Sequence, residues 1–82
     1  NPFNPETRIN YAVPKPARVT IEIFNTLGQK VRTLVDVDKP AGSYEVIWDG
    51  RNDHGQTVVS GIYFYQLRTA EAKLTRRMLL MR

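Results

Sequence analysis

Apolar and polar residues alternate along most of this chain with a period of two, the spacing of a β-strand that buries one face. In residues 17–25 the β-branched Val19, Ile21 and Ile23 share one face. The segments that show this alternation are 8–13, 17–25, 30–35, 43–48, 61–69 and 73–82. The period, together with the prolines, excludes a helical bundle.

Turn-forming residues separate these segments. Pro14 and Pro16 end the first, and Gly28 lies in a tight turn at 26–29, so 17–25 and 30–35 are predicted to form a hairpin. In the segment 30–35, Val31, Thr33 and Val35 are expected on one face. Residues 36–42 are interpreted as a polar connection and residues 49–56 as a long turn.

The two C-terminal segments differ in character. Residues 61–69 are apolar on both faces, which favours a central strand. Residues 73–82 are interpreted as a strand, although 71–81 could also be drawn as a short helix. Six or seven short strands predict an all-β fold, a small antiparallel immunoglobulin- or fibronectin-like β-sandwich of about seven strands.

Length and composition limit the possible functions. The chain has 82 residues, so we expect residues 1–82 to form a single domain. No apolar run approaches the ~20 residues that span a bilayer, and a net charge of +4 is a weak signal for nucleic acid. Without cysteine there is no disulfide or thiolate site. An opening without Met or a signal peptide predicts a piece of a longer protein.

The turn 49–56 carries the side chains that could bind a metal. His54 could be a base or a ligand, but one imidazole makes no metal cage, and we expect an exposed turn residue. Asp49, Asn52 and Asp53 could bind calcium, but the EF-hand spacing is absent and Arg51 adds positive charge. We expect these side chains to cap their own backbone.

Aromatic and basic side chains could form binding surfaces. Trp48, Tyr63, Phe64 and Tyr65 could be an exposed platform for sugar or single-stranded nucleic acid. In so small a sandwich we expect Trp48 and Phe64 in the core, with one of the two tyrosines left open. The basic residues near the C-terminus could bind an acidic partner or prevent aggregation of a sheet edge; they are Lys73, Arg76, Arg77 and Arg82. With no phosphate-binding loop, dinucleotide fingerprint or nucleophile elbow, the sequence predicts no enzyme and no cofactor.

Taken in order, the motifs resemble a known family. They are Asn1-Pro2-Phe3-Asn4-Pro5, the Leu27-Gly28-Gln29 turn, Trp48-Asp49-Gly50, Ser60-Gly61-Ile62-Tyr63 and Arg77-Met78-Leu79-Leu80. This series resembles the type A C-terminal sorting domain of the bacterial type IX secretion system. It is similar also to the immunoglobulin-like domain of flagellar hook-capping proteins.

The first resemblance implies a sorting domain at the C-terminus of a larger secreted protein. The outer-membrane translocon would recognise it after export to the periplasm, and the cargo would be released or attached to the cell surface. By position, Asn1 to Pro5 form the opening motif, Gly61 and Tyr63 the glycine-aromatic motif, and Lys73, Arg76 and Arg77 the terminal basic motif. Arg77 departs from the lysine of many members, which keeps the charge but changes the donor geometry.

Two alternatives remain open at this point. One is a non-catalytic immunoglobulin-like structural, assembly or accessory module that contacts only the upstream domains of its own chain or its neighbours. The other is carbohydrate binding through exposed tyrosines.

Overall fold

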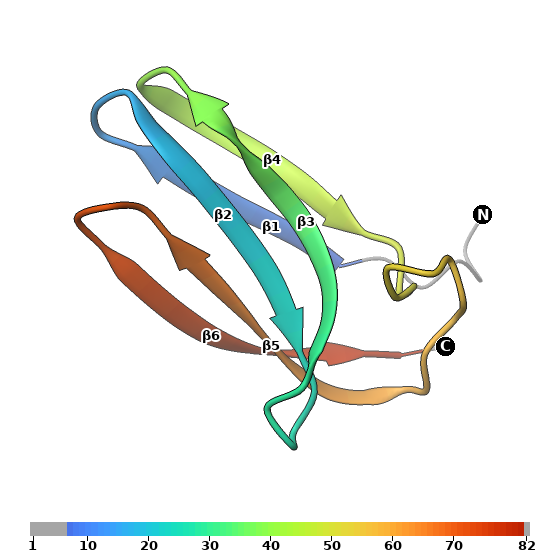
Figure 1. Ribbon diagram of the computed structural model, residues 1–82. Coiled ribbons are helices and arrows are strands. Elements are labelled where there is room, and N and C mark those ends of the chain that lie inside the picture. Colours follow the sequence, from blue (N-terminus) through green and yellow to red (C-terminus); the bar gives the residue numbers. More distant parts are fainter. Residues whose placement is uncertain (1–6, 82) are drawn as a thin grey trace.

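The computed structural model describes residues 7–81 and contains six β-strands in two layers (Figure 1). They are β1 (Thr7–Val13), β2 (Ala17–Phe24), β3 (Lys30–Lys39), β4 (Gly42–Trp48), β5 (Gly61–Arg68) and β6 (Lys73–Leu80). One sheet pairs β1 with β4, the other has the order β3-β2-β5-β6, and all pairs are antiparallel. The antiparallel sandwich expected from the sequence is confirmed, with a strand count within the expected six or seven.

The core lies between the two sheets and follows the period of two. Val19, Ile21 and Ile23 of β2 are completely buried, as predicted. The other sheet contributes Ile9, Val13 and Trp48, whose side chains are also buried. Alternation therefore gave the buried face of β1, β2 and β4 correctly, because successive side chains of a strand point to opposite faces.

Two predictions about β5 and β6 are settled by the pairing. β5 lies between β2 and β6, so the prediction of a central strand is confirmed. The segment that could also be drawn as a helix is a strand, and β6 pairs with β5 from Lys73 to Leu80 without a break in register.

Strand β3 is longer and less regular than the sequence predicted. It continues to Lys39, so the interpretation of residues 36–42 as a connection was wrong. Residues 36–39 stay in the sheet because they pair with Ala17–Thr20, and Arg18 forms ion pairs with Asp36 at 3.0 Å and Asp38 at 3.9 Å.

The expected common face of Val31, Thr33 and Val35 was also wrong. The β2–β3 register shifts twice, leaving Val31 and Leu34 as extra residues between paired positions. Such bulges change which face the following side chains occupy. Val31, Leu34 and Val35 consequently pack against the core, whereas Thr33 pairs with Glu22.

The turn between β2 and β3 follows the sequence prediction. Gly28 has a φ of +80°, a conformation that favours glycine. The side-chain Oδ1 of Asn25 accepts hydrogen bonds from the backbone N–H groups of Leu27 and Gln29, both at 3.0 Å. The tight turn at 26–29 is therefore confirmed.

Candidate functional site

Residues 49–58 form a turn that is held by its own side chains. Asn52 Oδ1 accepts backbone hydrogen bonds from His54 at 2.9 Å and Gln56 at 3.0 Å. Asp49 Oδ1 accepts the backbone N–H of Arg51 at 3.1 Å, and Asp53 Oδ1 accepts that of Thr33 at 3.0 Å. The prediction that these side chains cap their own turn is confirmed for Asp49 and Asn52. It was wrong for Asp53, which lies beside β3, where its backbone N–H also donates to the Val31 carbonyl at 3.0 Å.

The same contacts bear on the metal and base hypotheses. Asp49 also forms an ion pair with Arg32 at 3.1 Å, so protein donors already use its Oδ1 oxygen. His54 is exposed, as expected. Within residues 7–81, no three His, Cys, Asp or Glu side chains are grouped closely enough to hold a metal ion.

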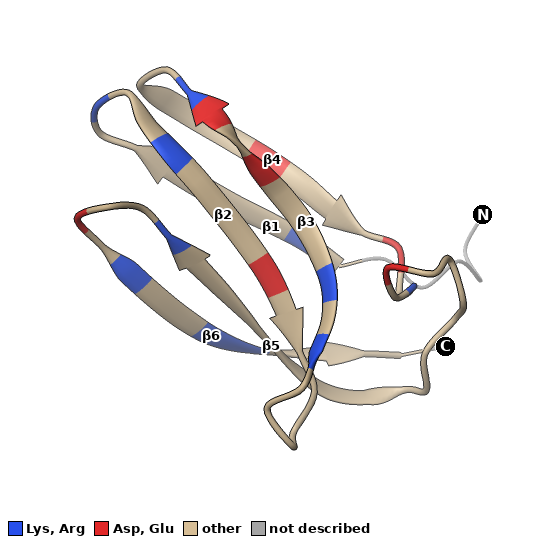
Figure 2. Cartoon of the chain, in the orientation of Figure 1, with Lys and Arg blue, Asp and Glu red and all other residues tan. Residues whose placement is uncertain are grey.

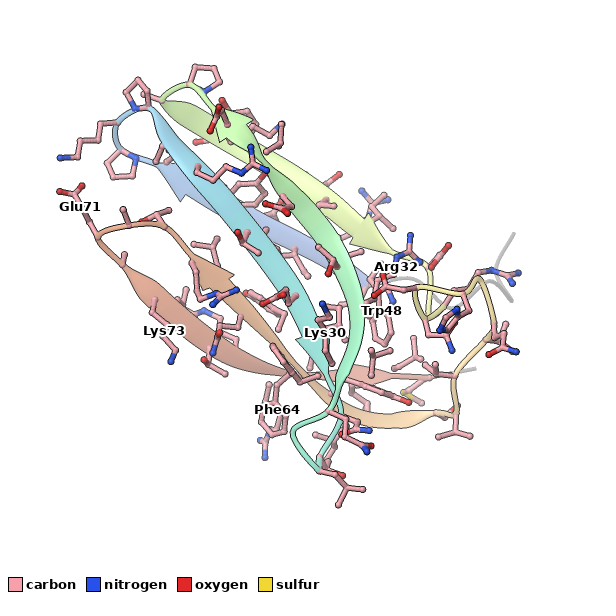
Figure 3. All side chains as sticks on the ribbon, viewed as in Figure 1. Lys30, Arg32, Trp48, Phe64, Glu71 and Lys73 are labelled. Atoms are coloured by element: carbon pink, nitrogen blue, oxygen red, sulfur yellow. The ribbon has the colours of Figure 1, made fainter. Side chains whose placement is uncertain are left out.

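The aromatic residues expected to form either a platform or the core do not all face the core. Trp48 and Tyr63 are buried and meet edge to face, with ring centroids 5.1 Å apart. Tyr65 is partly buried against the core. The prediction of Phe64 in the core was wrong. Phe64 takes the opposite face because it follows Tyr63, and it pairs with Phe24 of β2, apart from Trp48 (Figure 3).

A second aromatic pair joins the two strands of the smaller sheet. Tyr11 and Tyr44 are paired in register, and their rings stack with centroids 5.4 Å apart. Lys39 Nζ lies 4.6 Å from the centroid of the Tyr44 ring, whose hydroxyl donates to the Pro40 carbonyl at 2.6 Å. Burial raises the pKa of Tyr11 above its ordinary value of 10.0, and the neighbouring Tyr44 raises it further.

The raised pKa of Tyr11 predicts how stability changes in alkali. Above pH 10.0 the unfolded chain loses the Tyr11 proton first, so the folded state binds more protons and stability falls as pH rises through this window. We expect a Tyr11→Phe variant to lose less stability there than the unmodified chain. Urea unfolding at a series of alkaline pH values measures this, with Tyr65→Phe as a control. The Tyr65→Phe control should follow the unmodified chain. Equal pH dependence of stability in Tyr11→Phe and the unmodified chain would contradict the prediction.

The predicted partner-binding residues all lie on the β5–β6 hairpin. Lys73, Arg76 and Arg77 are exposed on β6. This strand is an edge of the four-stranded sheet, and its basic positions are blue in Figure 2. Lys73 and Arg77 lie on one face of the sheet and Arg76 on the other, because positions alternate along a strand. The three cations therefore share an edge but not a face.

The glycine-aromatic pair is placed differently from the cations. Gly61 begins β5 opposite Leu80, with a φ of +149°, and Tyr63 pairs with Met78. The Tyr63 side chain is buried, and its hydroxyl donates to the Val59 carbonyl at 2.7 Å. Tyr63 thus supports the fold beneath the hairpin and offers no exposed ring to a partner. The opening motif Asn1 to Pro5 and Arg82 lie outside the described residues.

An exposed apolar patch beside this hairpin was missed by the sequence analysis. Leu27, Val59 and Ile62 line a shallow hollow of about 320 Å³, and Ile62 pairs with Leu79 of β6. Leu79 is 57% exposed and Ile62 44%. The sequence did contain a sign of this patch. Ile62 and Leu79 each stand next to a buried residue of their strand, Tyr63 and Leu80, and so fall on the opposite face of the sheet.

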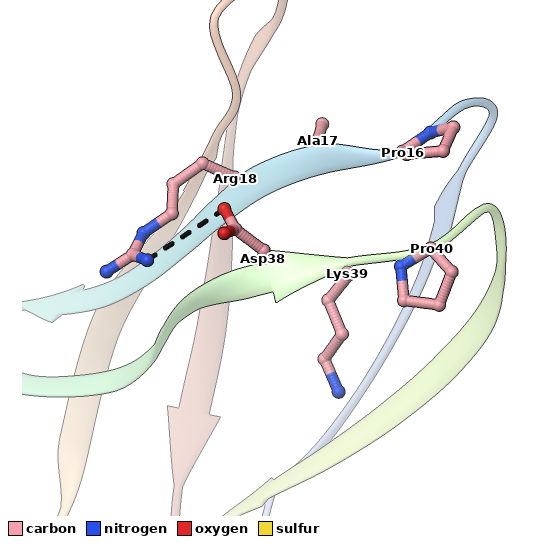
Figure 4. Close-up of a pocket in the computed structure, with 6 residues that line it drawn as sticks. All are labelled: Pro16, Ala17, Arg18, Asp38, Lys39 and Pro40. Carbon is pink, nitrogen blue, oxygen red and sulfur yellow. Dashed lines mark ion pairs between the residues drawn. The ribbon is translucent and has the colours of Figure 1, made fainter.

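A second shallow hollow, of about 420 Å³, lies at the other end of β2 and β3 (Figure 4). Its lining includes Pro16, Lys39 and Pro40, together with the Arg18–Asp38 ion pair. The two charged groups of the pair offset each other, which leaves Lys39, whose ammonium lies over the Tyr44 ring, as the remaining charge in the lining.

Comparison with known proteins places this architecture in a family. The model of the FlgD Ig-like domain matches residues 3–73. The chain belongs to the FlgD Ig-like domain family. This membership confirms the immunoglobulin-like, hook-capping part of the sequence resemblance, while nothing in the comparisons shows the sorting domain itself.

The fold of a solved structure agrees with this assignment. The chain is similar to the crystal structure of FlgD from P. aeruginosa, with a TM-score of 0.72 and 20% identity. The match covers 92% of this chain and 59% of that FlgD chain, so it demonstrates a shared fold over part of FlgD. No curated protein matched the sequence. Residues 7–81 contain no helix of the length and apolarity needed to cross a membrane.

Proposed function

We propose that this chain is a non-catalytic immunoglobulin-like assembly module that positions other domains or subunits of a larger protein. The observation that carries the proposal is membership of the FlgD Ig-like family over residues 3–73. FlgD is a hook-capping protein with a structural role. Residues 1–82 would form one such module of a longer exported protein, found at the cell surface or released from it.

The distribution of polar groups supports a structural role. The carboxylates of the described residues are used within the fold: Glu22, for example, binds Arg68 at 2.7 Å and Lys30 at 3.8 Å. The acidic groups of the 49–58 turn likewise accept hydrogen bonds from the backbone. A general acid or base must instead be free to exchange a proton with a substrate.

One observation favours a second function, that of a type IX sorting signal. Lys73, Arg76 and Arg77 are exposed on one edge strand, where a translocon could contact all three. Gly61 would shape the start of the same hairpin, and Tyr63 would hold it to the core. Under this alternative the edge of β6 is an address that the outer-membrane translocon reads.

A secretion assay separates the two functions. A fluorescent protein with an N-terminal Sec signal and residues 1–82 at its C-terminus is expressed in a bacterium that has a type IX system. For an assembly module we expect a folded fusion that stays in the periplasm, while a native sorting domain on the same reporter is exported.

Export of the fusion that is lost on deletion of the translocon would contradict the assembly-module proposal and support sorting. In that case the Lys73→Ala/Arg76→Ala/Arg77→Ala variant should fold normally and remain in the periplasm. Fractionation and the fluorescence of the reporter measure both properties in the same cells.

A further inference from the structure

The two edges of the four-stranded sheet differ in regularity. β3 forms one edge and is interrupted by extra residues at Val31 and Leu34. β6 forms the other edge and pairs with β5 without a register shift from Lys73 to Leu80. Bulges twist an edge and hinder the addition of another strand, whereas a regular edge offers an unpaired row of backbone groups.

The charges of β6 have no counterpart in the described part of the chain. Most other lysines and arginines between residues 7 and 81 lie within 4.0 Å of a carboxylate, as in the Lys15–Glu71 pair at 2.8 Å, and Lys39 lies over the Tyr44 ring. The cations in this range without such a partner are Lys73, Arg76 and Arg77. All three lie on the regular edge strand.

The apolar patch continues the same edge toward the end of β6. Leu79 lies on the same face of the sheet as Arg77 and Lys73, and its cross-strand neighbour Ile62 is also exposed. Along this face, the edge therefore presents basic, polar, basic and apolar side chains at Lys73, Thr75, Arg77 and Leu79.

We infer that the free edge of β6 accepts an acidic, extended peptide segment of a partner as an additional antiparallel strand. Carboxylates of the segment would lie opposite Lys73, Arg76 and Arg77, and an apolar side chain opposite Leu79. Main-chain hydrogen bonds would supply affinity and the alternating side chains would fix the register, as in other cases of strand addition. The inference rests on the proposed function, since it gives the module a class of partner.

Charge also argues against a second copy of this chain as the occupant. Two β6 strands paired edge to edge would bring six cations together with no carboxylate of their own. Like charges at facing positions of adjacent strands are destabilising. The edge thus discriminates against its own copies and in favour of acidic segments.

Binding to a synthetic peptide tests the inference directly on the 82-residue chain. The probe is the fluorescein-labelled peptide Thr-Val-Val-Glu-Glu-Thr-Val-Glu, whose antiparallel alignment places glutamates opposite the three cations and valine opposite Leu79. Fluorescence anisotropy measures affinity at moderate salt. The Lys73→Glu/Arg76→Glu/Arg77→Glu variant should bind this peptide at least about tenfold more weakly than the unmodified chain does. A peptide with lysine in place of each glutamate should restore binding to that variant.

Two controls separate strand addition from general attraction between opposite charges. An Arg8→Glu/Lys15→Glu/Arg18→Glu variant has the same net charge as the β6 variant but should keep the original affinity. A peptide with N-methyl groups at those alternate backbone nitrogens that face β6 keeps its charges but cannot complete the main-chain hydrogen bonds, so its binding should also fall about tenfold or more.

Three results would each overturn the inference. The N-methylated peptide could bind as tightly as the unmodified peptide, both charge variants could lose the same affinity, or the unmodified peptide could fail to bind. Self-association of the unmodified chain that is lost in the β6 variant would assign the edge to a second copy and would also overturn it. The secretion reporter judges the proposed assembly function separately, so a failure of peptide binding can be distinguished from a failure of the proposed function.

Discussion

Replacement of Trp48 with alanine should lower the free energy of unfolding by about 3 to 5 kcal/mol, the usual cost of truncating a large buried aromatic side chain. Trp48 is completely buried at the end of β4 and packs edge to face on Tyr63. Its indole N–H donates to the Arg51 carbonyl at 2.9 Å, so the ring also fixes the start of the 49–58 turn. Truncation would remove this contact between the sheets and the turn.

The size of this effect is large for such a small domain. Stabilities of about 0.05 to 0.15 kcal/mol per residue are typical, so the loss would be a large part of the total. Urea unfolding followed by far-ultraviolet circular dichroism measures it without depending on tryptophan fluorescence. Trp48→Phe, which keeps a ring but loses the indole donor, should be less destabilising than Trp48→Ala. A Trp48→Ala protein as stable as the unmodified chain would contradict the described core.

Replacement of Tyr63 with alanine should cost a similar amount, about 3 to 5 kcal/mol. Tyr63 is buried, contacts Trp48 and donates its hydroxyl to Val59. Tyr63→Phe keeps the ring and removes only the hydrogen bond, so it should cost about 1 kcal/mol. The same urea series measures both variants.

This second prediction decides how any functional effect of Tyr63 should be interpreted. The family resemblance suggested that Tyr63 contacts a partner, whereas the structure gives it a supporting role. Loss of peptide binding or of export in Tyr63→Ala should therefore follow the fraction unfolded, and Tyr63→Phe should retain function. A folded Tyr63→Phe protein that has lost peptide binding would show that the hydroxyl itself contacts the partner.

A double-mutant cycle between Trp48 and Tyr63 adds a control for the geometry. Aromatic pairs in edge-to-face contact are usually coupled by about 0.5 to 1.5 kcal/mol. We expect coupling in this range from the single and double alanine variants, provided that the double variant still folds. Ile62 is exposed on β5, next to Tyr63. Ile62→Ala should lower the free energy of unfolding slightly, without coupling to Trp48.

The amino-acid sequence by itself determined the approximate position and the buried face of most strands. Val19, Ile21 and Ile23 could be assigned to the core because alternation is a local property of neighbouring residues. The tight turn at Gly28 and the capping by Asp49 and Asn52 were equally predictable, since their partners lie only a few residues away. Short motifs in a fixed order also indicated the resemblance to the immunoglobulin-like domain of hook-capping proteins.

Only the tertiary structure decided which strands share a sheet and which charges are left without partners. The extension of β3 to Lys39 depends on pairing with β2 and on ion pairs to Arg18, and the bulges at Val31 and Leu34 exist only in that pairing. The position of the half-buried Phe64 on the outer face of the sheet likewise follows from the place of β5 in the sandwich, which turns Tyr63 toward the core. The isolation of Lys73, Arg76 and Arg77 became visible once the ion pairs of the other cations were known. These features depend on residues distant in sequence, and local periodicity carries no information about contacts of that kind.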